Sequence, residues 1–269
     1  LGDPVRFLLE FCLIPFDEDT VRSREGFEAL KASGKLAFDQ VPLLEIDGLQ
    51  LVQTQAILRY VAGSKGLRGY TPADQGVADM VVNGILDARM PLITARFGAD
   101  PQAALSKFES VTLPRLVRNV ERILLAHDGG YICRGGLSYA DIVLFEFLCY
   151  VADECQASLD SILCEDAPRV LKHHARISGF PHMREYLSSP RRKPRPDATF
   201  VRSTCAILGM PCPAHAQLTP GSAGSPAPVA SESGRSSSRG WSFAALGVAA
   251  TLCAALLLMP TRRAMAATR

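Results

Sequence analysis

Two short apolar runs on either side of Asp47-Gly48 constrain the fold of this 269-residue chain more than any other feature. The runs cover residues 41–46 and 49–52. They predict two strands joined by a tight turn, because Asp-Gly supplies the positive φ that a two-residue hairpin turn needs. A helix is predicted to begin at Thr54, directly after the second strand. The sequence here therefore predicts a hairpin that leads into a helix.

The two ends of this hairpin carry features that favour ligand binding. Pro42 cannot donate a hydrogen bond to a ladder, so it belongs at a strand start or an edge. The backbone of Val41 is thereby left to face something other than its own sheet. Thr54 is expected to cap the following helix, whose exposed amides lie at the positive end of the helix dipole. Together these residues predict a small pocket that accepts an anion.

The remaining segments divide the chain into two folded parts. The first contains a helix near residues 3–13, a strand near 16–21, a helix near 25–32 and a helix over 54–64, each indicated by apolar spacing and by turn residues. A linker rich in Gly and Pro follows at residues 66–73. Residues 74–209 show long helical periodicity without a strand signal, and Ser138 and Asp141 form a capping box within them.

Composition excludes several classes of function. The chain is 48% hydrophobic, which is typical of a globular protein. Its net charge of +2 does not indicate nucleic-acid binding. Its eight cysteines show no metal-ligand spacing, so reduced thiols in a cytosolic setting are expected. His173 and His174 are neighbours on a predicted helix and point about 100° apart, so we assign both to a helix surface and expect no metal site.

The C-terminal part differs in composition. Residues 210–240 are rich in Pro, Ser, Ala and Gly and predict a disordered stalk. Residues 241–259, from Trp241 to Met259, are apolar and uncharged, long enough to span about 30 Å of hydrocarbon. They predict a transmembrane anchor followed by a basic tail at 260–269, with the folded part facing the cytosol from the mitochondrial outer membrane or the endoplasmic reticulum. A buried C-terminal helix is the alternative.

The segment from Gln40 to Ala62, with its Val-Pro, Glu-Ile-Asp-Gly and Gln-Thr elements, resembles the cytosolic glutathione transferases, most closely their alpha-like and sigma-like classes. The resemblance continues to about Asp197. It implies an α/β thioredoxin-like domain over residues 1–65 and an all-α domain over 74–209. In that family one more strand precedes the first helix, so the resemblance implies a domain that lacks its first strand.

The resemblance also assigns a glutathione site. The Val41-Pro42 bond is expected to be cis, with the backbone of Val41 paired to the cysteinyl part of glutathione. Gln53 and Thr54 are expected to hold the γ-glutamyl carboxylate, and Gln40 occupies the neighbouring motif position. A further candidate contact, with the glycyl carboxylate, comes from Lys31, with Lys35 as a weaker choice. Both lysines have the alternative of being solvated helix ends.

Two positions imply a homodimer. Asp87 resembles the acid that crosses the dimer interface to meet the γ-glutamyl amine in the partner, and its alternative is a solvated acid on a helix. Phe38 matches the aromatic plug that enters the neighbouring subunit, and its alternative is a core phenylalanine.

Catalysis in this family uses a Tyr or Ser hydroxyl at the end of the first strand to stabilise the glutathione thiolate, since a free thiol has a pKa near 8.5. That residue is expected upstream of Leu1. Tyr60, Tyr131 and Tyr139 stand elsewhere in the pattern, so no catalytic residue is named.

We expect a membrane-anchored transferase with glutathione as co-substrate and no metal. It is expected to conjugate hydrophobic electrophiles and to reduce lipid hydroperoxides. The alternatives are a non-catalytic ligand-binding or scaffold protein with the same fold, and a glutathione-dependent isomerase.

Overall fold

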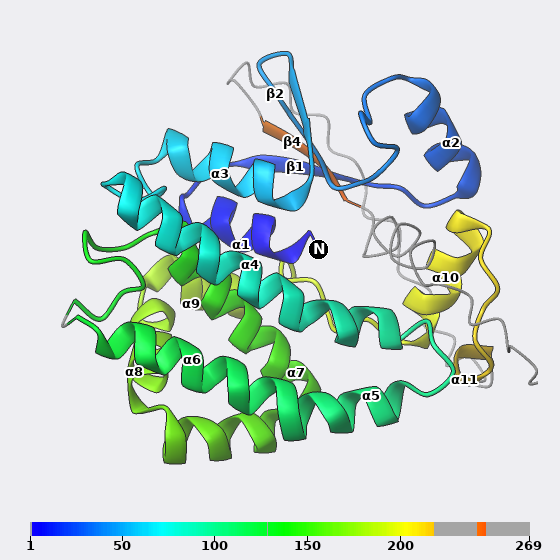
Figure 1. Ribbon diagram of the computed structural model, residues 1–269. Coiled ribbons are helices and arrows are strands. Elements are labelled where there is room, and N and C mark those ends of the chain that lie inside the picture. Colours follow the sequence, from blue (N-terminus) through cyan, green and yellow to red (C-terminus); the bar gives the residue numbers. More distant parts are fainter. Residues whose placement is uncertain (1, 128, 218–240, 246–269) are drawn as a thin grey trace, which may run out of the picture.

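The computed structural model describes residues 2–127, 129–217 and 241–245. A small sheet with three helices lies above a larger set of helices, and the long helix α4 runs between them (Figure 1). The N-terminal elements are α1 (Asp3–Phe11), β1 (Phe16–Thr20), α2 (Arg24–Ala32), β2 (Leu43–Ile46), β3 (Leu49–Val52) and α3 (Thr54–Ser64).

The helical part follows a capped start at Thr71, whose side chain and that of Asp74 exchange hydrogen bonds with each other's backbone amides. Its elements are α4 (Pro72–Ala95), α5 (Pro101–Lys107), the π-helix η1 (Phe108–Thr112), α6 (Leu113–Leu125), α7 (Tyr139–Asp166), α8 (Pro168–Ser178), α9 (Pro181–Ser188), α10 (Ala198–Leu208) and α11 (Ala214–Gln217).

The sheet contains a fourth strand from the far end of the chain, β4 (Trp241–Ala245), and its order is β1-β4-β2-β3. β4 runs parallel to β1, with Phe16 opposite Trp241. It runs antiparallel to β2, with Leu43 opposite Ala244. A segment more than two hundred residues away in the sequence therefore fills the centre of the sheet.

This strand corrects two expectations. The sheet was expected to lack a strand beside β1, and residues 241–245 were expected to begin a membrane-spanning helix. The structure places Trp241–Ala245 in that position as a strand instead, because the facing backbone groups of β1 and β2 both need hydrogen-bond partners. Residues 246–259 lie outside the described residues. Within the described part of the chain, every helix is too short or too polar to cross a bilayer.

The predicted hairpin is confirmed. Asp47 and Gly48 both have positive φ, at 46° and 81°, between β2 and β3. Leu43 lies opposite Val52 and Ile46 opposite Leu49, so the register is set by the two-residue turn.

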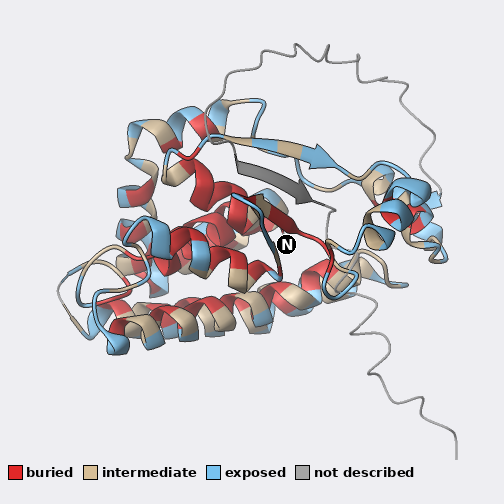
Figure 2. Ribbon diagram, turned by 90° about the horizontal axis from the view of Figure 1, so that it is seen from above, coloured by how far each residue is buried: buried red, intermediate tan, exposed pale blue. Residues whose placement is uncertain are grey.

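The core is continuous between the sheet part and the helical part. In Figure 2 the buried residues gather on the inward faces of the helices, while the outer faces are exposed. α1 contributes Val5, Leu8 and Leu9 to this core, and the first half of α7 is buried almost throughout. Because α1 and α7 pack against each other, the sheet part is held directly on the helical part.

The predicted capping box at Ser138 and Asp141 is confirmed: the Asp141 carboxylate accepts a hydrogen bond from the backbone N–H of Ser138, and a second one from its hydroxyl. Two other expectations change in the helical part. His173 is not on the surface: it is buried, with Nε2 2.9 Å from Asp141 Oδ1, so it fixes the start of α7 to α8. Residues 214–217, which the predicted stalk includes, form α11 instead and pack on α10 with Ala216 buried. Residues 218–240 of the predicted stalk lie outside the described residues.

Candidate functional site

The hairpin brings the two halves of the predicted pocket together. Because Leu43 pairs with Val52, the residue pairs just before β2 and just after β3 lie side by side. Gln53 Nε2 donates to Gln40 Oε1 at 3.0 Å across this gap. The Val41-Pro42 peptide bond is cis, as the resemblance implied. The register therefore brings five residues together at one end of β2 and β3: Gln40, Val41, Pro42, Gln53 and Thr54.

The start of α3 differs in one detail from the expected cap. Gln53, not Thr54, occupies the N-cap position, and its side chain makes no capping bond. Gln53 has φ 73° and ψ 112°, a region that costs a residue with a side chain roughly 1–3 kcal/mol. Thr54 is the first helical residue and is buried. The backbone amides and the dipole at the start of a helix favour an anionic ligand, so this helix start remains our candidate anion site.

The backbone of Val41 supplies the opposite wall. Val41 is 4% exposed, and its N–H and C=O have no backbone partner within residues 2–127 and 129–217. Buried backbone groups are nearly always paired. An extended ligand that lies along Val41 can therefore exchange hydrogen bonds with it while its anionic end meets α3.

The predicted lysines already have local partners. Lys31 Nζ lies 2.7 Å from Glu28 Oε2 and 5.1 Å from the centre of the Phe27 ring. Lys35 Nζ lies 2.9 Å from Glu45 Oε1. Each ammonium group has three donors, so a second carboxylate can bind beside the present partner or replace it.

The two predicted dimer positions are both on the surface. Phe38 is 65% exposed, so the alternative of a core phenylalanine is wrong. Asp87 is exposed on α4 and has no ion-pair partner among the described residues. Neither residue therefore contributes to the packing of its own chain.

Two of the tyrosines named from the sequence, Tyr131 and Tyr139, are held by contacts within the helical part. Tyr139 donates to Asp79, which also pairs with Arg59. Burial, followed by the hydrogen bond to Asp79, raises the pKa of Tyr139. Tyr131 lies against Arg176, 4.9 Å from its guanidinium carbon. These contacts confine both side chains to the helical part.

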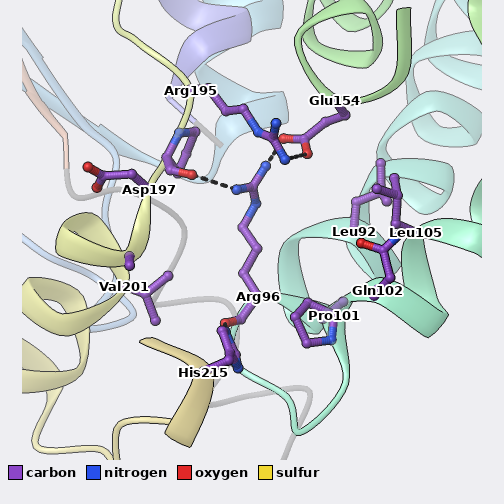
Figure 3. A pocket seen from close by; sticks show the side chains of 13 residues that line it. Leu92, Arg96, Pro101, Gln102, Leu105, Glu154, Arg195, Asp197, Val201 and His215 are labelled. Atoms are coloured by element: carbon purple, nitrogen blue, oxygen red, sulfur yellow. Dashed lines mark hydrogen bonds and ion pairs between the residues drawn. The ribbon is translucent and has the colours of Figure 1, made fainter. Parts of the chain in front are cut away.

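A cavity of about 430 Å³ lies between α4, α5, α7 and the segment that leads into α10 (Figure 3). Its apolar wall includes Leu92, Leu105 and Val201. Its polar wall is an ion-pair cluster in which Arg96 and Arg195 both reach the buried carboxylate of Glu154. We call this space the α4–α10 cavity. Sequence reasoning missed it, because its lining comes from segments about a hundred residues apart.

A smaller cavity connects this region to the start of α1. It is lined by Asp3 and Glu146, and it shares Arg195 and Pro196 with the α4–α10 cavity. Beneath it Arg89 of α4 and Glu146 of α7 form an ion pair with both side chains 2% exposed. Asp3, the first residue of α1, thus lines this smaller cavity, and α1 lies between the sheet and the helical part (Figure 1).

Comparison with known proteins agrees with this architecture. Residues 4–63 match the family "Glutathione S-transferase, N-terminal domain", and residues 86–190 match "Glutathione S-transferase, C-terminal domain". Glutathione S-transferase A2 of Homo sapiens is 33% identical over 205 residues, which cover 75% of this chain and 90% of that protein. Glutathione S-transferase A3 of Mus musculus is 32% identical over 209 residues, which cover 77% of this chain and 92% of that protein.

Solved structures show the same fold. Prostaglandin synthase D of Nilaparvata lugens superposes with a TM-score of 0.60 at 22% identity, covering 72% of this chain and 94% of that one. The glutathione S-transferase of Ascaris lumbricoides gives a TM-score of 0.57 at 23% identity, with the same coverage. The sequence relatives and both matched domains settle the assignment. The chain belongs to the glutathione S-transferase family and is a glutathione transferase, an enzyme that takes glutathione as co-substrate.

Proposed function

We propose that this enzyme binds glutathione along Val41 and the start of α3 and transfers its sulfur to hydrophobic electrophiles. The observation that carries the proposal is the hairpin register, which sets Val41 beside Gln53 and Thr54. A γ-glutamyl carboxylate at α3 accepts hydrogen bonds from the backbone amides of the helix start and from the Thr54 hydroxyl. The cysteinyl backbone pairs with Val41, next to Pro42, and Gln40 holds Gln53 in place.

The α4–α10 cavity is our candidate for the electrophile. Leu92, Leu105 and Val201 offer apolar contact, while Arg96 and Arg195 supply hydrogen-bond donors at one wall. A hydrophobic electrophile with a polar substituent fits this mixture. In the transfer, the thiolate sulfur forms a bond to the electrophilic carbon, and the leaving group departs with the displaced electron pair. No described side chain is assigned the activation of the thiol.

A homodimer is part of the proposal. Phe38 is exposed where an apolar plug needs to be, and Asp87 is exposed on α4 where it can meet a partner's glutathione. Exposed large aromatics are typical interface anchors. Lys31 is proposed to exchange Glu28 for the glycyl carboxylate when glutathione binds.

Reduction of lipid hydroperoxides and attachment to a membrane are finer proposals that depend on the C-terminal tail. Residues 241–245 cannot be paired in the sheet and inserted in a bilayer at the same time. Once they are paired, the apolar run keeps only residues 246–259, fewer than the roughly 20 residues of a spanning helix. Carbonate extraction of membranes decides between these states, because a paired tail releases the protein and an inserted tail retains it.

The binding proposal is tested by Thr54→Val in the full chain. Loss of the hydroxyl leaves a charged carboxylate one donor short, which costs roughly 1–3 kcal/mol in binding free energy. Calorimetric titration with glutathione should therefore show a clearly raised Kd. Thr20→Val, at an exposed position of β1, is the matched control and should leave the Kd unchanged. Equal affinity of the Thr54→Val variant and the unmodified chain refutes the assignment.

The transfer step is tested by a conjugation assay with a chloronitrobenzene electrophile. The protein should produce the thioether faster than glutathione alone does, and an unchanged rate would contradict the proposed substrate class.

A further inference from the structure

Two cysteines, Cys205 and Cys212, lie beyond residue 190, where the match to the C-terminal family model ends. Cys205 lies on α10 and is 2% exposed, whereas Cys212 is half-buried in the turn before α11. Both belong to one apolar cluster with Val201 and Ala216. Cys212 packs against this cluster, and its Sγ donates to the carbonyl of Pro213 at 3.9 Å. The two thiols therefore lie in one small apolar unit, close enough for each to affect the other.

The chain between them turns back in a way that holds this arrangement. Gly209 ends α10 with φ 66°, and the Met210 amide donates to the Cys205 carbonyl at 2.9 Å. Pro211 and Pro213 flank Cys212 and restrict its backbone. The Gln217 side chain donates to the Cys212 carbonyl, and Arg202 donates to the carbonyl of Ala216 at 2.7 Å. Little conformational freedom has to be lost for the two thiols to meet.

The same unit forms a wall of the α4–α10 cavity. Val201, one helical turn before Cys205, lines the cavity, and so does His215 of α11 (Figure 3). His215 Nε2 lies 3.1 Å from the carbonyl oxygen of Arg96, so α11 is attached to the end of α4. A covalent link between α10 and α11 would fix the position of that wall.

We propose that Cys205 and Cys212 form a reversible disulfide that locks α10 to α11 and thereby regulates access of electrophiles to the α4–α10 cavity. The regulation rests on the proposed function of that cavity, whereas the disulfide itself does not.

The oxidant is glutathione disulfide. The thiolate of Cys212, the more exposed of the pair, attacks one sulfur of glutathione disulfide and releases one glutathione thiolate. The Cys205 thiolate then attacks the Cys212 sulfur of the mixed disulfide and releases the second glutathione thiolate. The two protein thiols lose two electrons, and their two protons leave with the two glutathione molecules. Burial raises the pKa of Cys205, so its thiolate forms least readily and the resolving attack is the slower of the two steps.

Peptide mapping tests the disulfide without any activity measurement. Trypsin leaves Cys205 and Cys212 in one peptide that ends at Arg235, and cyanogen bromide cuts that peptide between them at Met210. After the full-length protein is incubated with glutathione disulfide, the two fragments should remain joined in most molecules. They should separate after reduction with dithiothreitol. Cys212→Ser should abolish the joining, and Cys164→Ser, at an exposed cysteine of α7, should leave it intact.

Separate fragments after oxidation, or a glutathione adduct that stays on Cys212, would overturn the disulfide. Its effect on the cavity is tested with the unmodified chain and Cys212→Ser side by side. Oxidation should change the KM for a hydrophobic electrophile at least twofold in the unmodified chain only, with the KM for glutathione unchanged. If the fragments remain joined and neither KM changes, the disulfide stands and the regulation of the cavity is wrong.

Discussion

The sheet and the helical part of this enzyme are stabilised by different kinds of contact. α4 to α9 follow one another along the chain and pack around one core, with capping boxes at Thr71 and Ser138 that are local in sequence. The sheet depends on β4, whose partners β1 and β2 lie near the opposite end of the chain. A remote central strand closes a long loop, which costs entropy before any ladder bond forms.

This difference predicts that the glutathione site is the part most sensitive to the C-terminal segment. Leu43 follows the Val41-Pro42 pair directly and lies opposite Ala244 of β4. The strand from the tail therefore supports the backbone that we propose binds the cysteinyl part of glutathione. The helical core shares no ladder with β4.

The largest effect is expected when the chain is ended after Gln217, which removes β4. Each buried backbone group that loses its partner costs roughly 1–3 kcal/mol, and several are lost on β1 and β2 together. Their sum reaches the ~5–15 kcal/mol that stabilises a typical domain. Titration should show no glutathione binding, and hydrogen exchange should show loss of protection in β1 and β2 while α7 stays protected.

A second truncation, after Ala245, is the matched control because it retains β4. It should bind glutathione as the full chain does. If both truncations bind equally well, another segment or no segment supports the sheet, and the comparison between the two parts fails.

The helical part is expected to be most sensitive at its buried charges. Arg89→Met leaves Glu146 buried without its cationic partner, which should lower the free energy of unfolding by roughly 3–5 kcal/mol. Arg89 also lies 4.8 Å from the Tyr150 ring and 5.3 Å from the Phe147 ring, and these contacts are lost too. Urea denaturation measures the change.

The double variant Arg89→Met with Glu146→Leu separates charge from packing. It removes both charges, so it should recover most of the lost stability. A double variant as unstable as the single one would show that the ion pair is not what the helices depend on. Neither variant should change the pairing of β4.

The smallest effect is expected at Phe38, a surface residue that neither the sheet nor the helical part needs for its own folding. Phe38→Ser should raise the Kd of the homodimer roughly 30-fold, since an anchoring aromatic contributes about 2 kcal/mol. Leu49→Ser, at an exposed apolar position of the neighbouring hairpin, is the control. Light scattering across a dilution series gives both values. A monomer at every concentration of the unmodified chain would exclude the homodimer.

Local patterns were enough to predict the hairpin, the capping box at Ser138 and most helix positions, because turn chemistry and apolar spacing act over a few residues. They failed where a remote partner decides the outcome. Trp241–Ala245 forms a strand although its apolar run suggested a membrane helix, and His173 is buried because Asp141 lies on another helix. Neither partner is visible in the neighbouring sequence.

The candidate site shows the same contrast between residues that meet through local sequence and residues that meet through remote packing. Gln40, Val41, Gln53 and Thr54 belong to one hairpin, so a short motif was sufficient to predict that they meet. The α4–α10 cavity and the Cys205–Cys212 pair depend on how α4, α7, α10 and α11 pack, for which the sequence carries no local signal.

A crystal structure of the full chain with bound glutathione tests the central claim most directly. The account predicts the γ-glutamyl carboxylate at the amides of Gln53 and Thr54 and the cysteinyl backbone hydrogen-bonded to Val41. It also predicts that the sulfur points toward the crevice between α1 and the α4–α10 cavity. Glutathione bound at another surface, or bound without contact to Val41 and Thr54, would contradict it.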